Sequence, residues 1–184
     1  MSFLDEAQGM SFPIPEKLAK ELKPFDKLEN EDERSVVSPD TTRWQVTSLR
    51  AGFNKSGKRQ LCVNIAAKGI DGTYKDAGEV AIWVSEEQVG KAGSVQRQIA
   101  NSIAAASVGW GISTRKDWPD NMSGKQILDT LNNVIVRNGE RAKGATFTAN
   151  LAFSRRFYTV ASTGERVNKE EQTFQFIKDA AKAV

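Results

Sequence analysis

The sequence of 184 residues contains no histidine and a single cysteine, Cys62. Without histidine, the chain lacks the usual general base, the common zinc ligand and every Ser-His or Cys-His catalytic arrangement. One cysteine excludes an internal disulfide and any multi-cysteine metal site. Cys62 also has no basic neighbour two residues away in its predicted strand, so we expect a structural thiol.

Carboxylate chemistry remains open in principle. The acidic residues that could gather around magnesium are Asp71, Asp76, Asp117 and Asp120. They lie in predicted loops, where aspartate usually forms turns. We therefore predict that the protein is not an enzyme and carries no metal or cofactor.

Long apolar runs are also missing. No stretch approaches the roughly 18 apolar residues that a transmembrane helix needs. The segment Met1 to Glu6 has neither the basic nor the apolar region of a signal peptide. We expect a soluble, cytoplasmic protein with no membrane partner.

Charge is unevenly distributed along the chain. Residues 1–40 carry five Lys/Arg and ten Asp/Glu, whereas residues 41–184 carry 21 and 13. A basic body favours a polyanionic partner, although charge can also serve solubility alone. We divide the chain into an acidic N-terminal arm, 1–40, with a short helix from Pro15 to Leu22, and a folded domain, 41–184.

From Thr41 onward, apolar and polar residues alternate with the period of a β-strand. The predicted strands are 44–46, 61–65, 80–84, 134–136, 145–161 and 173–177. A polar turn at 54–58 joins the first two into a hairpin. The last residues, 178–184, resemble a frayed helix.

Two helices interrupt the strands. Ser94 is a predicted N-cap for a helix that ends near Gly109. Ser123 and Gln126 form a capping box for a second helix, which we expect to stop at Asn132-Asn133. The order predicts a mainly β, α+β protein: a five-stranded oligonucleotide-binding (OB)-like barrel with a helix pair between strands 3 and 4. A β-sandwich with a helical insertion would give the same pattern.

Aromatic and basic side chains alternate along these strands and loops. Proteins that bind single strands hold phosphates in a positive groove and stack bases on aromatic faces. The candidate nucleic-acid-binding residues in the first three strands and their loops are Arg50, Phe53, Lys55, Lys58, Arg59, Tyr74, Lys75 and Trp83. The alternative for an aromatic residue is burial in the core, which we expect for Phe147, Phe153, Phe174 and Phe176.

A second constellation is the run from Arg155 to Tyr158. In a strand, Arg155 and Phe157 share one face, and Arg156 and Tyr158 share the other. We add Arg155, Arg156 and Tyr158 to the nucleic-acid-binding candidates. The alternative is a solvated edge that blocks strand-to-strand aggregation.

A basic loop flanked by Trp110 and Trp118 follows the first helix. These tryptophans could face a ligand, but we expect Trp118 with Pro119 to plug the open end of the barrel.

Several segments together carry a family resemblance: Trp44-Gln45-Val46, the turn 54–58, the strand 61–65, the loop 72–78, the strand 80–84, Gly109-Trp110-Gly111, and Trp118 with Ser123-Gly124-Lys125. In order and spacing, the chain from 41 to 177 resembles small phage-encoded single-stranded-DNA-binding proteins with an OB fold. The resemblance implies non-catalytic binding of single-stranded DNA in phage replication or recombination, with no cofactor, in the cytoplasm of the infected bacterium.

One feature departs from that family. Its members often end in an acidic tail, but residues 178–184 are not acidic, and the acidic run lies at 29–33. We hypothesise that the arm takes the tail's role, covers the basic groove without DNA and contacts replication or host proteins. Deleting residues 1–38 should then tighten DNA binding at low salt.

Two other functions fit the same sequence. A virion or assembly structural protein would use an N-terminal arm and exposed strand edges, and it would form large homo-oligomers without DNA. An inhibitor of a host defence protein would use the acidic arm as a mimic of DNA phosphates.

Overall fold

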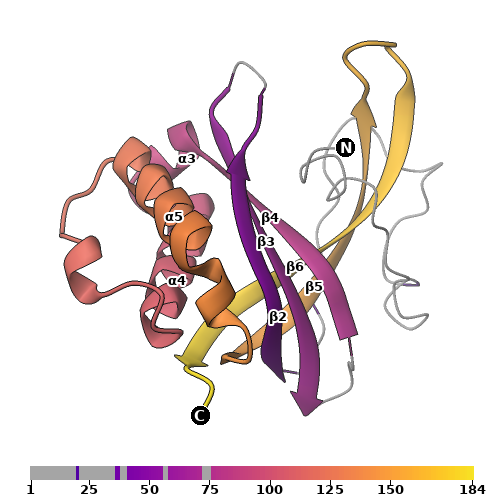
Figure 1. Ribbon diagram of the computed structural model, residues 1–184. Coiled ribbons are helices and arrows are strands. Elements are labelled where there is room, and N and C mark those ends of the chain that lie inside the picture. The colour runs from indigo at the N-terminus through magenta and orange to yellow at the C-terminus, as the bar shows by residue number, and fades with distance from the viewer. Residues whose placement is uncertain (1–19, 21–35, 38–40, 56–57, 72–75) are drawn as a thin grey trace.

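The structure, a computed structural model, describes residue 20 and residues 36–37, 41–55, 58–71 and 76–184 (Figure 1). Its elements are β1 (Val36–Val37), β2 (Thr42–Phe53), β3 (Gln60–Asp71), β4 (Asp76–Ser85), α3 (Glu86–Gly90), α4 (Val95–Gly109), the 3-10 helix η2 (Arg115–Asp117), α5 (Gly124–Asn138), the 3-10 helix η3 (Gly139–Ala142), β5 (Thr146–Thr159) and β6 (Arg166–Ala181). The predicted succession of three strands, helices and two strands is confirmed, with β1 and α3 as additions. The helix predicted from Pro15 to Leu22 lies outside the described residues, apart from residue 20.

All six strands form one antiparallel sheet. The hydrogen-bonded path runs β1-β5-β2-β3-β4, and β6 pairs with β5. β2 pairs along its length with β3, while its first residues, Thr42 to Gln45, also pair with Ala149 to Thr146 of β5. The predicted mainly β, α+β class is therefore confirmed.

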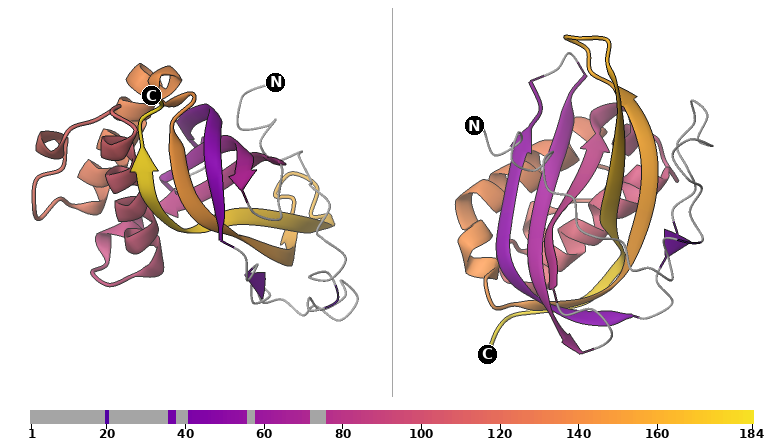
Figure 2. Two further views of the ribbon diagram at one scale, coloured as in Figure 1. Left: turned by 90° about the horizontal axis from the view of Figure 1, so that it is seen from below. Right: turned by 90° about the vertical axis from the view of Figure 1, so that its right-hand side faces the viewer.

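The predicted closed barrel is not confirmed. The path ends at β4 on one side and at β1 on the other, while β6 branches off β5 and contacts β4. No hydrogen-bonded ladder joins β4 to β6 in the part of the chain that the structure describes. The result is a strongly curved, open sheet (Figure 2). Register shifts in β2 and β5 accompany this curvature, because each bulge adds local twist.

The helices cover one face of this sheet (Figures 1 and 2). α5 packs against β2, and α4 packs against β4 and β6. Alternation along β3 sends Leu61, Val63 and Ile65 into the core between the layers. The next residues along β3 therefore face away from the helices.

Aromatic side chains fill the centre of the core. The rings of Trp44 and Phe147 both meet Phe174 edge-on, with centroids 5.3 and 5.1 Å away. Phe153 is buried as well. The core positions predicted for Phe147, Phe153 and Phe174 are confirmed; the side chain of Phe176 lies outside the described set.

Both tryptophans of the loop after α4 are buried. Trp110 donates its indole N–H to the carbonyl of Thr146 at 3.2 Å, and Trp118 donates to the Ser113 hydroxyl at 3.0 Å. Because the sheet is open, Trp118 fills the core beside the helical layer instead of plugging the end of a closed barrel.

The predicted helix starts are confirmed. The Ser94 hydroxyl accepts the backbone N–H of Arg97, and Ser123 and Gln126 form the capping box of α5. The predicted stop at Asn132-Asn133 and the strand at 134–136 are wrong, because α5 continues to Asn138. Ile135 is buried on the same helical face as Leu128 and Leu131, and this packing outweighs the strand preference of a β-branched run.

The frayed helix predicted at 178–184 is also wrong. β6 extends to Ala181, pairing Lys178 with Thr148 and Ala181 with Thr146. The end of α4 presses directly on this strand, since a Cβ on Gly109 would collide with the backbone of Ala180. The tail thus gains a tertiary partner that its own sequence does not reveal.

None of the helices in the described ranges is long and apolar enough to cross a membrane.

Candidate nucleic-acid interface

The sheet presents two different environments to the predicted site residues. One is the seam where the β2–β3 hairpin meets α3 and α5. The other is the face of β2, β3 and β4 that points away from the helices, which we call the open face. The β2–β3 and β5–β6 hairpins project from the same end of the sheet (Figure 1).

Arg59 lies in the seam. Its guanidinium stands 4.4 Å from the centre of the Phe53 ring, a cation–π distance. It also forms an ion pair with Asp129 of α5, and its Nε lies 3.5 Å from Glu86 of α3. Two carboxylates therefore offset this charge, and Arg59 ties the hairpin to the helical layer. The partly buried Phe53 ring packs against the core below it.

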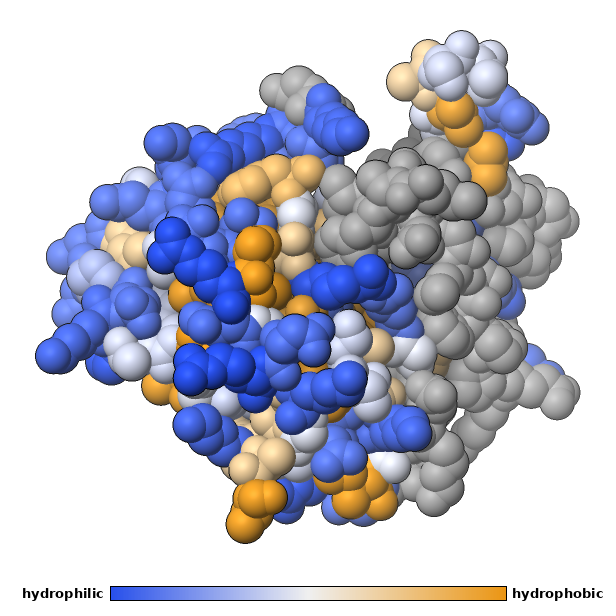
Figure 3. Space-filling view, viewed as in Figure 1, coloured by the Kyte–Doolittle hydropathy of each residue, from blue (hydrophilic) through white to orange (hydrophobic). Residues whose placement is uncertain are grey.

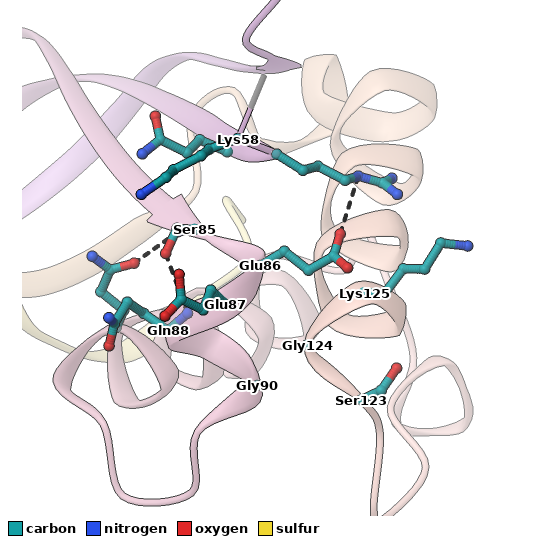
Figure 4. A pocket seen from close by; sticks show the side chains of 12 residues that line it. Lys58, Ser85, Glu86, Glu87, Gln88, Gly90, Ser123, Gly124 and Lys125 are labelled. Atoms are coloured by element: carbon teal, nitrogen blue, oxygen red, sulfur yellow. Dashed lines mark hydrogen bonds and ion pairs between the residues drawn. The ribbon is translucent and has the colours of Figure 1, made fainter. Parts of the chain in front are cut away.

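A polar hollow of about 690 Å³ opens beside this seam (Figure 4). Its lining comes from the hairpin, α3, α4 and the start of α5: Lys58, Arg59, Gln60, Ser85, Glu86, Glu87, Gln88, Gly90, Gln96, Ser123, Gly124 and Lys125. Its charged lining residues include both cations and carboxylates. The Lys91 ammonium donates a hydrogen bond to the Glu87 carboxylate at 2.9 Å, which lowers the pKa of that carboxyl. The cations Lys58, Arg59 and Lys125 thus share the hollow with the carboxylates of Glu86 and Glu87.

Gly124 permits the close contact between α3 and α5 beneath the hollow. A Cβ there would lie 2.5 Å from the Glu86 carbonyl oxygen and 2.6 Å from the Gly90 nitrogen. Sequence reasoning identified Ser123-Gly124-Lys125 only as a helix start. The convergence of α3 with that start joins segments about 35 positions apart, so no local pattern marks it.

The open face carries a different arginine. Arg50 on β2 donates from Nε to Glu79 on β4 at 3.1 Å, and its Nη2 pairs with the same oxygen. The side chain of Arg50 is 40% exposed and that of Glu79 only 11%. The strand between them contributes Asn64, which stands opposite Arg50 in the register.

Trp83 lies on this open face too, opposite Cys62 and partly buried. The sequence left open whether a helix covers Trp83; its register places it on the face away from the helices.

Cys62 is fully buried under the same face. Burial, reinforced by the negative charge of Glu79 and opposed by the positive charge of Lys169, raises the pKa of the thiol to about 12. The thiol stays protonated at neutral pH and is a poor nucleophile, as the sequence predicted.

Arg155 lies on the β5–β6 hairpin. Its side chain is only 16% exposed, and its Nε donates to Glu170 at 2.9 Å, directly across the ladder. Lys169 forms a similar pair with Glu171 at 2.9 Å. The side chains of Arg156 and Tyr158 lie outside the described set.

The predicted residues thus fall into separate groups. Phe53, Lys58 and Arg59 gather at the seam, Arg50 and Trp83 lie on the open face, and Arg155 lies on the second hairpin. Lys55 and Lys58 are exposed, and within the described residues neither forms an ion pair. Tyr74 and Lys75 lie outside the described residues.

The helical layer presents a largely hydrophilic exterior, with apolar side chains in small separate spots (Figure 3). Exposed apolar residues such as Val95 and Val136 stand singly. Among the described residues, no group of three or more Cys, Asp or Glu side chains is placed to hold a metal ion.

Comparison with known proteins returned no match. No family model fits the chain, and neither a curated protein sequence nor a solved structure matches it significantly.

Proposed function

We propose that this protein binds single-stranded DNA, without catalysis, across the open face and between the two projecting hairpins. The observation that carries the proposal is that Trp83 and the cation Arg50 share the sheet face that the helices leave uncovered. Aromatic faces for bases and cations for phosphates are the two requirements of a single-strand platform.

The strand arrangement supports this location. Counting β2 to β6 as strands 1 to 5, the helices fall between strands 3 and 4, and strand 1 pairs with both strands 2 and 4. We interpret the sheet as an opened OB-like barrel. In that fold the face of strands 2 and 3, with the loops 1–2 and 4–5, holds oligonucleotides. The equivalent parts here are β3, β4 and the two hairpins.

The exposed cations lie where this path would need them. Lys55 and Lys58 stand at the β2–β3 hairpin, and Arg166 begins β6 next to the turn of the other hairpin. A strand laid across the open face would pass between these positions. The resemblance to phage single-stranded-DNA-binding proteins points to the same activity.

The test is fluorescence anisotropy with a labelled single strand of about 30 nucleotides, several times the span of one such platform, against the matched duplex at two salt concentrations. We expect selective binding of the single strand that weakens steeply with salt, accompanied by quenching of tryptophan fluorescence. In Trp83→Ala, affinity should fall about tenfold and part of the quenching should disappear.

Equal binding of duplex and single strand, or no binding at low salt, would contradict the proposal. Large DNA-free oligomers on a sizing column would then favour the assembly role, and a monomer would favour a protein partner.

A further inference from the structure

The Arg50–Glu79 ion pair crosses the centre of the open face. The register aligns Arg50 with Asn64, and Glu79 with Ala66, the position two residues further along β3. Neighbouring strands lie about 4.8 Å apart, so a pair that joins β2 to β4 must pass over β3. It does so above the stretch between Asn64 and Ala66.

Asn64 lies beneath this bridge with an unused donor. The residue is 1% exposed, and its Nδ2 has no hydrogen-bond partner in the described part of the chain. The amide oxygen accepts the Cys62 thiol at 3.6 Å. An unpaired buried donor destabilises the fold, so its presence calls for an explanation, and a functional partner is one of the known ones.

Arg50 is suited to a change of partner. A guanidinium presents a planar fork of N–H donors that fits a carboxylate and a phosphate equally well. Its half-exposed position gives an arriving phosphate direct access, whereas Glu79 approaches it from the more buried side. Trp83 lies on the same face, on the neighbouring strand β4, opposite Cys62, two residues before Asn64 on β3. We expect it to reach the adjoining base.

We propose that the Glu79 carboxylate occupies the position on the Arg50 guanidinium that a DNA phosphate takes on binding. The replacement of Glu79 by the phosphate exposes Asn64 Nδ2 for a hydrogen bond to a base. This inference rests on the proposed function and names the internal competitor at its site. Arg50 then holds the backbone, Asn64 completes its hydrogen bonding on a base oxygen or ring nitrogen, and Trp83 stacks the neighbouring base.

The test compares single-strand affinity and its salt dependence in Glu79→Gln and the wild type. Gln keeps the shape of the side chain and removes its charge. We expect affinity to rise about fivefold at low salt, because the phosphate no longer has to displace a carboxylate. The slope of log K against log salt should stay the same in Glu79→Gln, because the wild-type complex already holds that phosphate on Arg50, and it should become shallower by about 0.7 in Arg50→Ala, which loses one phosphate contact. In the Arg50→Ala background, Glu79→Gln should change neither quantity.

Two controls separate this exchange from a general gain of positive charge. Glu140→Gln removes the same charge from exposed η3 on the helical side, and it should raise affinity far less than Glu79→Gln. Glu79→Asp keeps the charge and shortens its reach toward Arg50, so affinity should rise with net charge constant. This second variant also serves if Glu79→Gln folds poorly by circular dichroism.

An unchanged affinity in Glu79→Gln, or a gain that persists in Arg50→Ala, would overturn the exchange while leaving the DNA-binding proposal intact. Failure of every variant, including the wild type, to bind single strands would remove both.

Discussion

Arg59 and Arg50 belong to the same β2–β3 hairpin and both contact carboxylates, yet their surroundings differ. Arg59 has Phe53 beneath it and two carboxylates from two helices around it. Arg50 pairs with Glu79 across β3 and lies over the buried Asn64 Nδ2, which has no hydrogen-bond partner within the described residues. The first arrangement is complete without a ligand, and the second leaves a donor unused. An ion pair therefore says little about function until the groups beneath it are examined.

The largest expected effect breaks the seam that holds Arg59. Gly124→Ala places a Cβ against the Glu86 and Gly90 backbone, which must move apart to admit it. We expect the free energy of unfolding to fall by about 2–3 kcal/mol, measured by urea denaturation. Gly90→Ala is the matched control, because a Cβ at that neighbouring position meets nothing within 4 Å. A loss of equal size in both variants would refute the close-contact explanation.

The next largest effects should distinguish the roles of the two arginines. Arg59→Ala removes a cation–π contact and leaves Asp129 and Glu86 close together, so stability should fall by about 1–2 kcal/mol with little change in DNA affinity. Arg50→Ala should weaken DNA binding and change stability little.

Thermal melts and anisotropy on both variants provide the measurement. Arg115→Ala breaks an ion pair whose partners are 77% and 86% exposed, and it should alter neither quantity. If Arg59→Ala weakens DNA binding more than Arg50→Ala, the seam and the open face have been assigned the wrong way round.

The smallest effect has an unusual sign. Asn64→Ala removes a buried donor that lacks a partner, so we expect stability to stay equal or to rise by up to about 1 kcal/mol. The same change should weaken single-strand binding. Thr42, whose buried hydroxyl has no partner within the described residues either, lies on the helix-covered side of the sheet, and Thr42→Val gives the matched control. That control should gain stability without losing DNA affinity; a clear loss of stability in Asn64→Ala would show that the amide is already satisfied.

Much of the local structure could be read from the sequence. Alternation located β2, β3 and β4, and the Ser94 and Ser123 caps located α4 and α5, because these signals depend only on near neighbours. Predictions failed where distant segments decide the outcome. Ile135 stays helical through its packing, and the chain after Lys178 stays extended because β5 offers it a pairing edge.

The candidate site divides in the same way. The sequence identified Arg50, Arg59 and Trp83 as residues able to bind nucleic acid, since residue type and nearby turns suffice for that. It could not tell that Arg50 would meet Glu79, 29 positions away, or that Arg59 would meet Asp129, 70 positions away.

By itself, then, the sequence determined which residues alternate, where the helices begin, and that histidine and multi-cysteine chemistry is absent. The tertiary structure decided which face each arginine occupies, which carboxylate reaches it, and that the side-chain N–H donor of Asn64 has no partner within the described residues. The physical reason is range: periodicity and capping act over a few residues, whereas ion pairing and burial depend on strands and helices that only the folded sheet brings together.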